Sequence, residues 1–234
     1  MPPLVHVVWA DLDRAATAAL PRWREILSQD ENARAARFRF ARDRNRYIAR
    51  RGILRLLLAR QLDRAPAALR FGANAYGKPL LIGGGCEFNL SQSRGLALFA
   101  LGADIAIGCD IEFHDRGFLA ENIPERFFSP AELDELRAAP AEAQIIAFFN
   151  GWTRKEAYIK ARGLGMSLPL DSFDVSLAPD ERPPLHRGCV GWSARTVAPA
   201  PGCSAAIIAE GTNWDIAAHS LDPLALLREA LIAV

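Results

Sequence analysis

Over residues 105–112, the apolar residues Ile and Cys alternate strictly with small or acidic residues, the period that is typical of a β-strand. The side chains of a strand point to its two faces in turn, so the apolar residues share one face. The other face then carries two carboxylates, Asp110 and Glu112, together with small residues. This strand is therefore predicted to bury one side and to present a pair of acids on the other.

Residues 152–160 follow the period of a helix instead. Glu156 and Lys160 are four positions apart and so lie on the same face of that helix. With Asp110 and Glu112 they provide three carboxylates and one ammonium group on rigid elements. Such a set indicates a site for a hard cation that holds a phosphate. The alternative for the two strand acids is a polar face that pairs with arginine.

The remaining pattern predicts further strands and helices. Strands are expected at 4–9, 96–101 and 104–112, and a further strand is expected to run through residue 88. Helices are expected at 15–27, 46–62 and 129–162. The strands at 96–101 and 104–112 are expected to pair around a turn at Gly102 and Ala103.

The second half of the chain begins its helices with a clear signal. Residues 129–132 read Ser-Pro-Ala-Glu, which predicts a capping box with proline in the first helical turn. A break is expected near Pro140, and short apolar runs between Pro and Gly turns predict strands across 173–234. This order of elements predicts an α+β fold with two similar halves, 1–105 and 106–234. No sequence repeat is strong enough to prove a duplication.

Composition limits the classes of protein that fit. The 234 residues suffice for one large domain or for two halves of roughly 110 residues. Half of the residues are apolar and the net charge is +1, as in an ordinary globular protein. The four cysteines form neither a CxxC pair nor a zinc spacing with the four histidines, which indicates a reducing, cytoplasmic setting. We see no signal peptide and no apolar run that could span a bilayer.

Basic residues are unevenly distributed. Only three of the 28 are lysine, namely Lys78, Lys155 and Lys160. Residues 34–64 contain eleven Arg and two Asp, a net charge of +9 in a chain of net charge +1. This segment is either a solvated arginine-rich helix face or an anion site for phosphates, and the concentration of charge favours the second. Nucleic-acid binding is not expected, because no motif supports it and the overall charge is close to neutral.

Several short motifs occur together in one order. They are Arg37-Phe38 with Arg46, Tyr-Gly-Lys-Pro at 76–79, Phe-Asn-Leu-Ser-Gln-Ser at 88–93, Gly-Cys-Asp-Ile-Glu at 108–112, Arg-Phe-Phe-Ser at 126–129, Trp152 with Lys-Glu-Ala at 155–157 and Lys160, and Gly-Met-Ser-Leu-Pro-Leu-Asp-Ser-Phe at 165–173. In this order and spacing the chain resembles the Sfp-type 4′-phosphopantetheinyl transferases, from about residue 34 to residue 173.

The resemblance implies a fold and an activity. It implies a pseudo-two-fold pair of α+β halves, with coenzyme A and Mg²⁺ in the cleft between them. The reaction would transfer the phosphopantetheine arm of coenzyme A to a serine of an acyl- or peptidyl-carrier protein and release adenosine 3′,5′-bisphosphate. Fatty acid, polyketide and nonribosomal peptide systems all present such a serine. A monomer is expected, because the two halves supply both walls of the cleft.

The resemblance also assigns residues. It implies that Asp110, Glu112 and Glu156 hold the metal, and that Lys160 contacts the phosphates at the reacting centre. The chemistry itself also needs a base for the serine hydroxyl, and Glu156 is the candidate, either directly or through a metal-bound water. The coenzyme A site would also be lined by five residues of the first half: Arg34, Arg46, Lys78, Ser91 and Gln92.

One position departs from the family pattern. Where this chain has Gln92, family members commonly have a histidine that contacts the 3′-phosphate of coenzyme A. Glutamine donates hydrogen bonds but carries no charge. We therefore expect Gln92 to contribute less to the binding of that phosphate, independently of pH, unless a nearby arginine compensates.

Two other readings of the same residues are open. One is an inactive protein that binds coenzyme A or a carrier, and the other is a Mg²⁺-dependent nucleotide phosphohydrolase. Phe118, Leu119, Phe127 and Phe128 form either an apolar patch for a carrier helix or part of the core.

Overall fold

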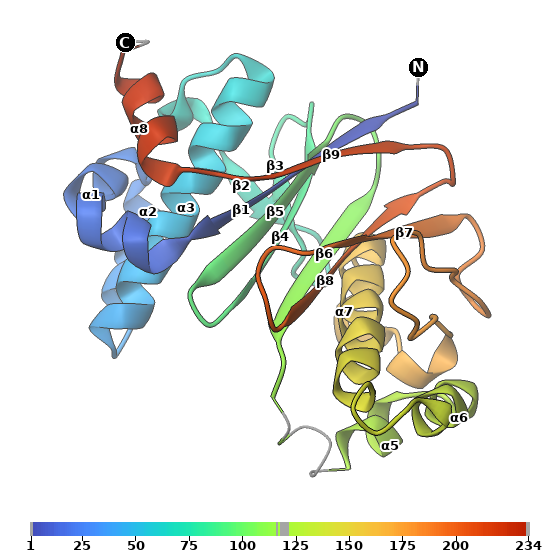
Figure 1. Ribbon diagram of the computed structural model, residues 1–234. Coiled ribbons are helices and arrows are strands. Elements are labelled where there is room, and N and C mark those ends of the chain that lie inside the picture. Colours follow the sequence, from blue (N-terminus) through green and yellow to red (C-terminus); the bar gives the residue numbers. More distant parts are fainter. Residues whose placement is uncertain (1, 116, 118–121, 233–234) are drawn as a thin grey trace.

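A computed structural model of the protein describes residues 2–115, 117 and 122–232 (Figure 1). It is a mixed α+β fold, as the sequence predicts. In chain order the elements are β1 (Leu4–Asp11), α1 (Leu12–Ile26), α2 (Gln29–Ala36), α3 (Ala41–Leu62), η1 (Pro66–Ala68), β2 (Phe71–Ala73), β3 (Pro79–Leu81), β4 (Glu87–Ser93), β5 (Leu96–Gly102), β6 (Ile107–Phe113), α5 (Ile123–Phe127), α6 (Pro130–Ala138), α7 (Gln144–Arg162), η2 (Gly165–Ser167), η3 (Leu170–Ser172), β7 (Trp192–Val197), β8 (Cys203–Glu210), β9 (Asp215–Ser220) and α8 (Pro223–Ile232).

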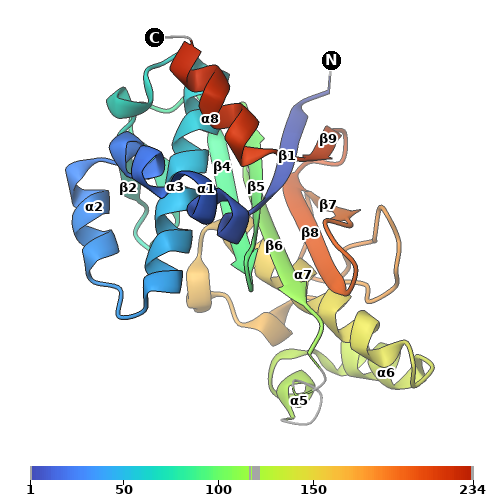
Figure 2. The same cartoon turned by 60° about the vertical axis from the view of Figure 1, so that its left-hand side comes forward.

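The strands form two larger sheets and one small ribbon. The first sheet has the order β4-β5-β1-β9, the second has the order β6-β8-β7, and β2 pairs with β3. Helices α1, α2, α3 and α8 lie on the outer side of the first sheet, and α7 lies on the outer side of the second (Figures 1 and 2). Each sheet thus carries a long helix, α3 or α7, on its outer face, which gives the two similar halves that the sequence predicts.

Both faces of the two central strands, β1 and β5, are buried, and this explains their nearly continuous apolar sequences. In β1, Val5 and Val7 pack between the two sheets, whereas Val8 and Ala10 pack against the helices. The core between the sheets also contains Ile107 and the other apolar side chains of β6. The face of β6 that carries the two acids is therefore turned away from this core, toward α7.

The predicted pairing of 96–101 with 104–112 is wrong. β5 pairs with β4 and β1, and β6 pairs with β8 in the other sheet. Between the two strands, Asp104 has a left-handed backbone (φ 53°), and Ile105 already packs in the core between the sheets. Apolar periodicity defines the face that a strand buries. Two strands of different sheets can pack such faces against each other without forming hydrogen bonds between their backbones.

The end of the chain returns to the first half. β9 pairs with β1 in parallel, and α8 buries Leu226 and Leu227 against the helical core of α1 and α3. The sequence predicts strands throughout this region and misses α8. The sequence signal for the start of α8 is Asp222 followed by Pro223. In the structure the Asp222 carboxylate accepts a hydrogen bond from the Leu224 amide at 3.0 Å, near the start of the helix. The division between residues 105 and 106 falls in the link between β5 and β6, and it stays a prediction.

The predicted capping box is confirmed at the start of α6. The Ser129 amide donates to Glu132 at 2.8 Å, and the Glu132 amide donates to the Ser129 hydroxyl at 3.3 Å. Helix α7 ends at Gly163, which has a left-handed backbone (φ 63°) that glycine adopts without strain. Among the helices of the described residues, we find none that combines the length and the hydropathy needed to cross a membrane.

Candidate functional site

The acidic face of β6 lies directly against α7. Gly108 makes this close approach possible, because a Cβ at this position would overlap the Ala157 carbonyl oxygen and the Ala161 amide nitrogen. The contact places Asp110 and Glu112 opposite the face of α7 that carries Glu156 and Lys160. The sequence-predicted grouping of these four residues is therefore present in the fold.

Asp110 is the centre of this group. Its side chain is buried, and its Oδ1 accepts a hydrogen bond from the Lys160 ammonium at 2.5 Å and from the Ser91 hydroxyl at 2.7 Å. Lys160 also donates to the Ser91 hydroxyl at 3.3 Å. The second oxygen, Oδ2, is buried and has no hydrogen-bond partner among the described residues. A buried carboxylate oxygen without a donor is an acceptor that still lacks its ligand.

The strand β4 holds β6 through its side chains. Ser93 donates to Glu112 at 2.7 Å, and the Asn89 carbonyl oxygen accepts from the Cys109 amide at 2.9 Å. With Ser91 on Asp110, every second residue from Asn89 to Ser93 bonds to β6. The first half of the chain thus fixes the position of both strand acids.

The charges of the group act on one another. Burial raises the pKa of Glu112 and of Glu156, and the negative charge of Asp110 contributes to both shifts. Burial alone would lower the pKa of Lys160, but the charge and hydrogen bond of Asp110 outweigh burial, and the pKa of Lys160 is raised. One ammonium faces three carboxylates, so the group has an excess of negative charge and favours a further cation.

The residues of this group fit a hard divalent cation only in part. No three carboxylate, imidazole or thiolate groups in the part of the chain that the structure describes form a ready-made metal site. Mg²⁺ does not require one, because it commonly binds one or two carboxylates and takes its other ligands from phosphates and water. The unpartnered Oδ2 of Asp110 and the all-oxygen donors suit that mode of binding.

Lys78 lies next to the same group. Its ammonium donates to the main-chain carbonyls of Ile107 at 3.0 Å and Ala161 at 3.1 Å, and so joins β6 to the end of α7. Burial lowers the pKa of Lys78. Of the residues that the resemblance assigns to coenzyme A, the structure brings Ser91 and Lys160 to the acidic group and Lys78 to the junction of β6 and α7.

The other three lie on the opposite face of β4, along α3. Arg46 is paired with Asp13, at 2.7 Å from Nε and 2.5 Å from Nη2, and also donates to the Arg94 carbonyl. Gln92 accepts a hydrogen bond from Arg50 at 2.9 Å, and Arg34 is exposed near the ring of Tyr47. These residues therefore do not join the acidic group.

A cavity of about 370 Å³ lies on this side of β4. Its arginines come from α2 and α3 (Arg34, Arg50 and Arg51), its aromatic residues are Tyr47, Phe71 and Phe88, and the acids Asp30 and Glu31 line it as well. Arg50 is not among the residues assigned from the sequence. It lies one helical turn after Arg46, but this spacing does not indicate which of the two arginines pairs with an acid.

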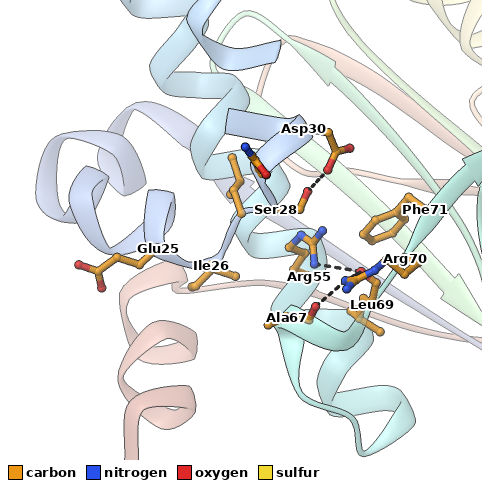
Figure 3. A pocket seen from close by; sticks show the side chains of 11 residues that line it. Glu25, Ile26, Ser28, Asp30, Arg55, Ala67, Leu69, Arg70 and Phe71 are labelled. Atoms are coloured by element: carbon orange, nitrogen blue, oxygen red, sulfur yellow. Dashed lines mark hydrogen bonds between the residues drawn. The ribbon is translucent and has the colours of Figure 1, made fainter. Parts of the chain in front are cut away.

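Two other arginines of α3 are structural. Glu31 forms ion pairs with Arg51 and, at 2.6 Å, with Arg55, whose Nη1 donates to the carbonyls of Pro66 and Leu69. Arg55 also lines a cavity of about 410 Å³ that reaches Leu69 (Figure 3). The arginine-rich segment is thus in part a buried ion-pair network rather than a solvated face.

The two residues of the proposed apolar patch that the structure describes pack on the core. Phe128 is buried, and Phe127 is half-buried with its ring edge-to-face on Trp152 at 5.6 Å. Phe118 and Leu119 lie outside the described residues.

The chain is similar to known proteins of one family. A family model described as the 4′-phosphopantetheinyl transferase superfamily matches residues 106–204, which include β6 and α7. The 4′-phosphopantetheinyl transferase HetI of a Nostoc species is 39% identical over 192 residues, 80% of each chain. The 4′-phosphopantetheinyl transferase Sfp of Bacillus subtilis is 32% identical over 174 residues, 72% of this chain and 76% of that one. The chain therefore belongs to the 4′-phosphopantetheinyl transferase superfamily.

Proposed function

We propose that this protein transfers the phosphopantetheine arm of coenzyme A to a serine hydroxyl of an acyl- or peptidyl-carrier protein. Transfer would depend on Mg²⁺ and release adenosine 3′,5′-bisphosphate. The observation that carries the proposal is the acidic group of Asp110, Glu112, Glu156 and Lys160, with one buried carboxylate oxygen that still lacks a partner. The protein would act in the cytoplasm, and all four of its cysteines are free thiols.

The chemistry is a phosphoryl transfer. A bond forms between the serine oxygen and the β-phosphorus of coenzyme A, and the bond from that phosphorus to the bridging oxygen breaks. The leaving adenosine bisphosphate keeps the electron pair, and the serine proton passes to a base. Catalysis of this kind rests mainly on positioning and on charge stabilisation.

The residues of the group have distinct tasks. Lys160, held by Asp110 and Ser91, directs its ammonium at the pyrophosphate and stabilises the charge that builds up there. Glu156 is the carboxylate of α7 placed to accept the serine proton, and burial raises its pKa toward the range of a useful base. Asp110, Glu112 and Glu156 would hold Mg²⁺, which would neutralise charge on the pyrophosphate when bound.

The first experiment is the intact mass of a purified apo-carrier protein after incubation with this protein, coenzyme A and Mg²⁺. We expect a gain of one phosphopantetheine arm that disappears when a chelator is added. Phosphate or pantetheine products without any carrier would instead identify a phosphohydrolase. Coenzyme A binding without transfer to fatty-acid, polyketide or peptide carriers would identify an inactive binding protein.

A further inference from the structure

The turn between β4 and β5 contains an arginine at a position that suits glycine better. Arg94 has a left-handed backbone (φ 54°), which is strained for a residue with a Cβ and free of strain for glycine. The next residue, Gly95, is required for a different reason, because a Cβ there would overlap the Asp13 carboxylate that pairs with Arg46. A glycine at position 94 would form the same turn at lower cost, so the arginine side chain is the feature to explain.

The contacts of the Arg94 side chain leave its charge available. Its guanidinium lies over the ring of Phe113, 5.0 Å from the ring centre, and its Nη2 donates to the His114 carbonyl at 3.4 Å. Within the part of the chain that the structure describes, no carboxylate forms an ion pair with Arg94, whereas Arg46 below the same turn is paired with Asp13. The side chain is exposed, so most of its five N–H donors are free for a partner.

Arg94 also lies at the edge of the acidic group. The residue before it, Ser93, donates to Glu112 at 2.7 Å, and the two residues that the Arg94 side chain contacts directly follow Glu112. The turn is held in place, because Arg46 donates to the Arg94 carbonyl and the Phe113 amide donates to the Ser93 hydroxyl at 3.2 Å. An exposed cation is therefore fixed beside a group that has an excess of negative charge.

The position of this cation fits a protein substrate better than the pyrophosphate of coenzyme A. The pyrophosphate must lie near Lys160, which bonds to Asp110. The contacts of Arg94 reach His114, four residues further along β6 and thus about 13 Å away along the strand. A carrier protein has to bring its serine to the acidic group, and three carboxylates repel an acidic surface unless a cation at the edge offsets them.

We propose that Arg94 binds an acidic side chain of the carrier protein next to the serine that is modified, and thereby favours carriers with an acidic surface at that point. This inference rests on the proposed function. It makes Arg94 a residue for partner recognition, and it explains why an arginine occupies a strained position in the turn.

The test measures the binding of an apo-acyl-carrier protein whose target serine is replaced by alanine, so that no transfer occurs. Arg94→Gly removes the cation and relieves the backbone, so it should unfold in urea no earlier than the unmodified protein. We expect its affinity for the carrier to fall about 3- to 10-fold at low salt, the effect of one charge pair at the rim of an interface. In about 0.5 M NaCl the difference should shrink to roughly twofold or less, because salt screens exposed charges.

Two further variants make the test specific. Arg22→Gln removes the same charge from an exposed arginine that pairs with Glu25, and it should bind the carrier normally. Arg94→Glu should bind more weakly than Arg94→Gly. A carrier in which lysine replaces the acid next to the serine should recover affinity for Arg94→Glu.

The outcomes that would overturn the proposal are distinct. They are equal carrier affinity with and without the Arg94 side chain, a difference that high salt does not reduce, and no carrier binding at all. A loss of coenzyme A affinity in calorimetry, with carrier affinity unchanged, would assign Arg94 to coenzyme A instead. Carrier binding does not require transfer, so Arg94-dependent binding together with a failed transfer assay would reject the proposed function alone.

Discussion

The two carboxylate oxygens of Asp110 have different surroundings, and this difference leads to a prediction. Oδ1 is saturated by Lys160 and Ser91, while Oδ2 is buried without a partner. Asp110→Asn keeps the shape but removes the charge, so it should lower the transfer rate by about 100-fold or more. The rate is measured by the mass of the carrier protein over time. The exposed Asp134 gives the control Asp134→Asn, which should transfer at the normal rate.

The same substitution also tests the proposed metal. Asp110→Asn should stay folded in circular dichroism, because asparagine keeps the shape of the side chain and its carbonyl oxygen can still accept from Ser91. Normal turnover would contradict a metal site at Asp110. Loss of the folded state instead would show that the Lys160 pair is mainly structural.

At the residue scale, the sequence identifies the groups that lie in regular elements. Strand alternation finds Asp110 and Glu112, and helical spacing finds Glu156 and Lys160. It assigns Arg46 to the coenzyme A site and not Arg50, because Arg46 is neutralised by Asp13, a residue 33 positions away that no local pattern connects to it. Which arginine remains unpaired is a property of the packed molecule and not of any local pattern.

At the scale of elements, the site depends on how closely α7 approaches β6. Gly108 permits this contact, and Gly108→Ala would force the helix and strand apart. We expect a loss of about 3 kcal/mol or more in the free energy of unfolding, at the upper end of the usual cost of overpacking. Urea unfolding measures this loss. Gly72→Ala is the matched control, because its Cβ would meet only ordinary contacts from 3.4 Å upward.

The outcome also tests how the site is assembled. If Gly108→Ala is as stable as the unmodified protein, the helix can move without cost and the close packing is not required. The sequence predicts both elements and groups their charged residues, but it does not predict the close backbone contact at Gly108. For the same reason it pairs β5 with β6 wrongly, since the pattern of a strand defines its faces and not its neighbours.

At the scale of the whole molecule, buried ion pairs link segments that are far apart in the sequence. Glu31 of α2 is almost fully buried, and it joins α2 to α3 through Arg51 and Arg55. Arg55 in turn holds the carbonyls of Pro66 and Leu69. One carboxylate therefore fixes three segments, and its charge should be measurable in the stability of the whole fold.

Stability against pH gives the sharpest test of this network. Burial alone would raise the pKa of Glu31, but the two arginines outweigh it, and the pKa lies below its usual value of 4.5. A lowered pKa contributes stability above pH 4.5, and this contribution is lost as the pH falls through the folded-state value. Glu31→Gln should therefore cost about 3 kcal/mol in the free energy of unfolding at pH 7, because it leaves Arg55 buried and unpaired. The cost should become progressively smaller below pH 4.5.

Urea unfolding of both proteins between pH 7 and pH 3.5 measures the difference, with the exposed Glu25→Gln as a control that should change little. A difference that stays constant over this range would mean that the charge of Glu31 does not stabilise the fold.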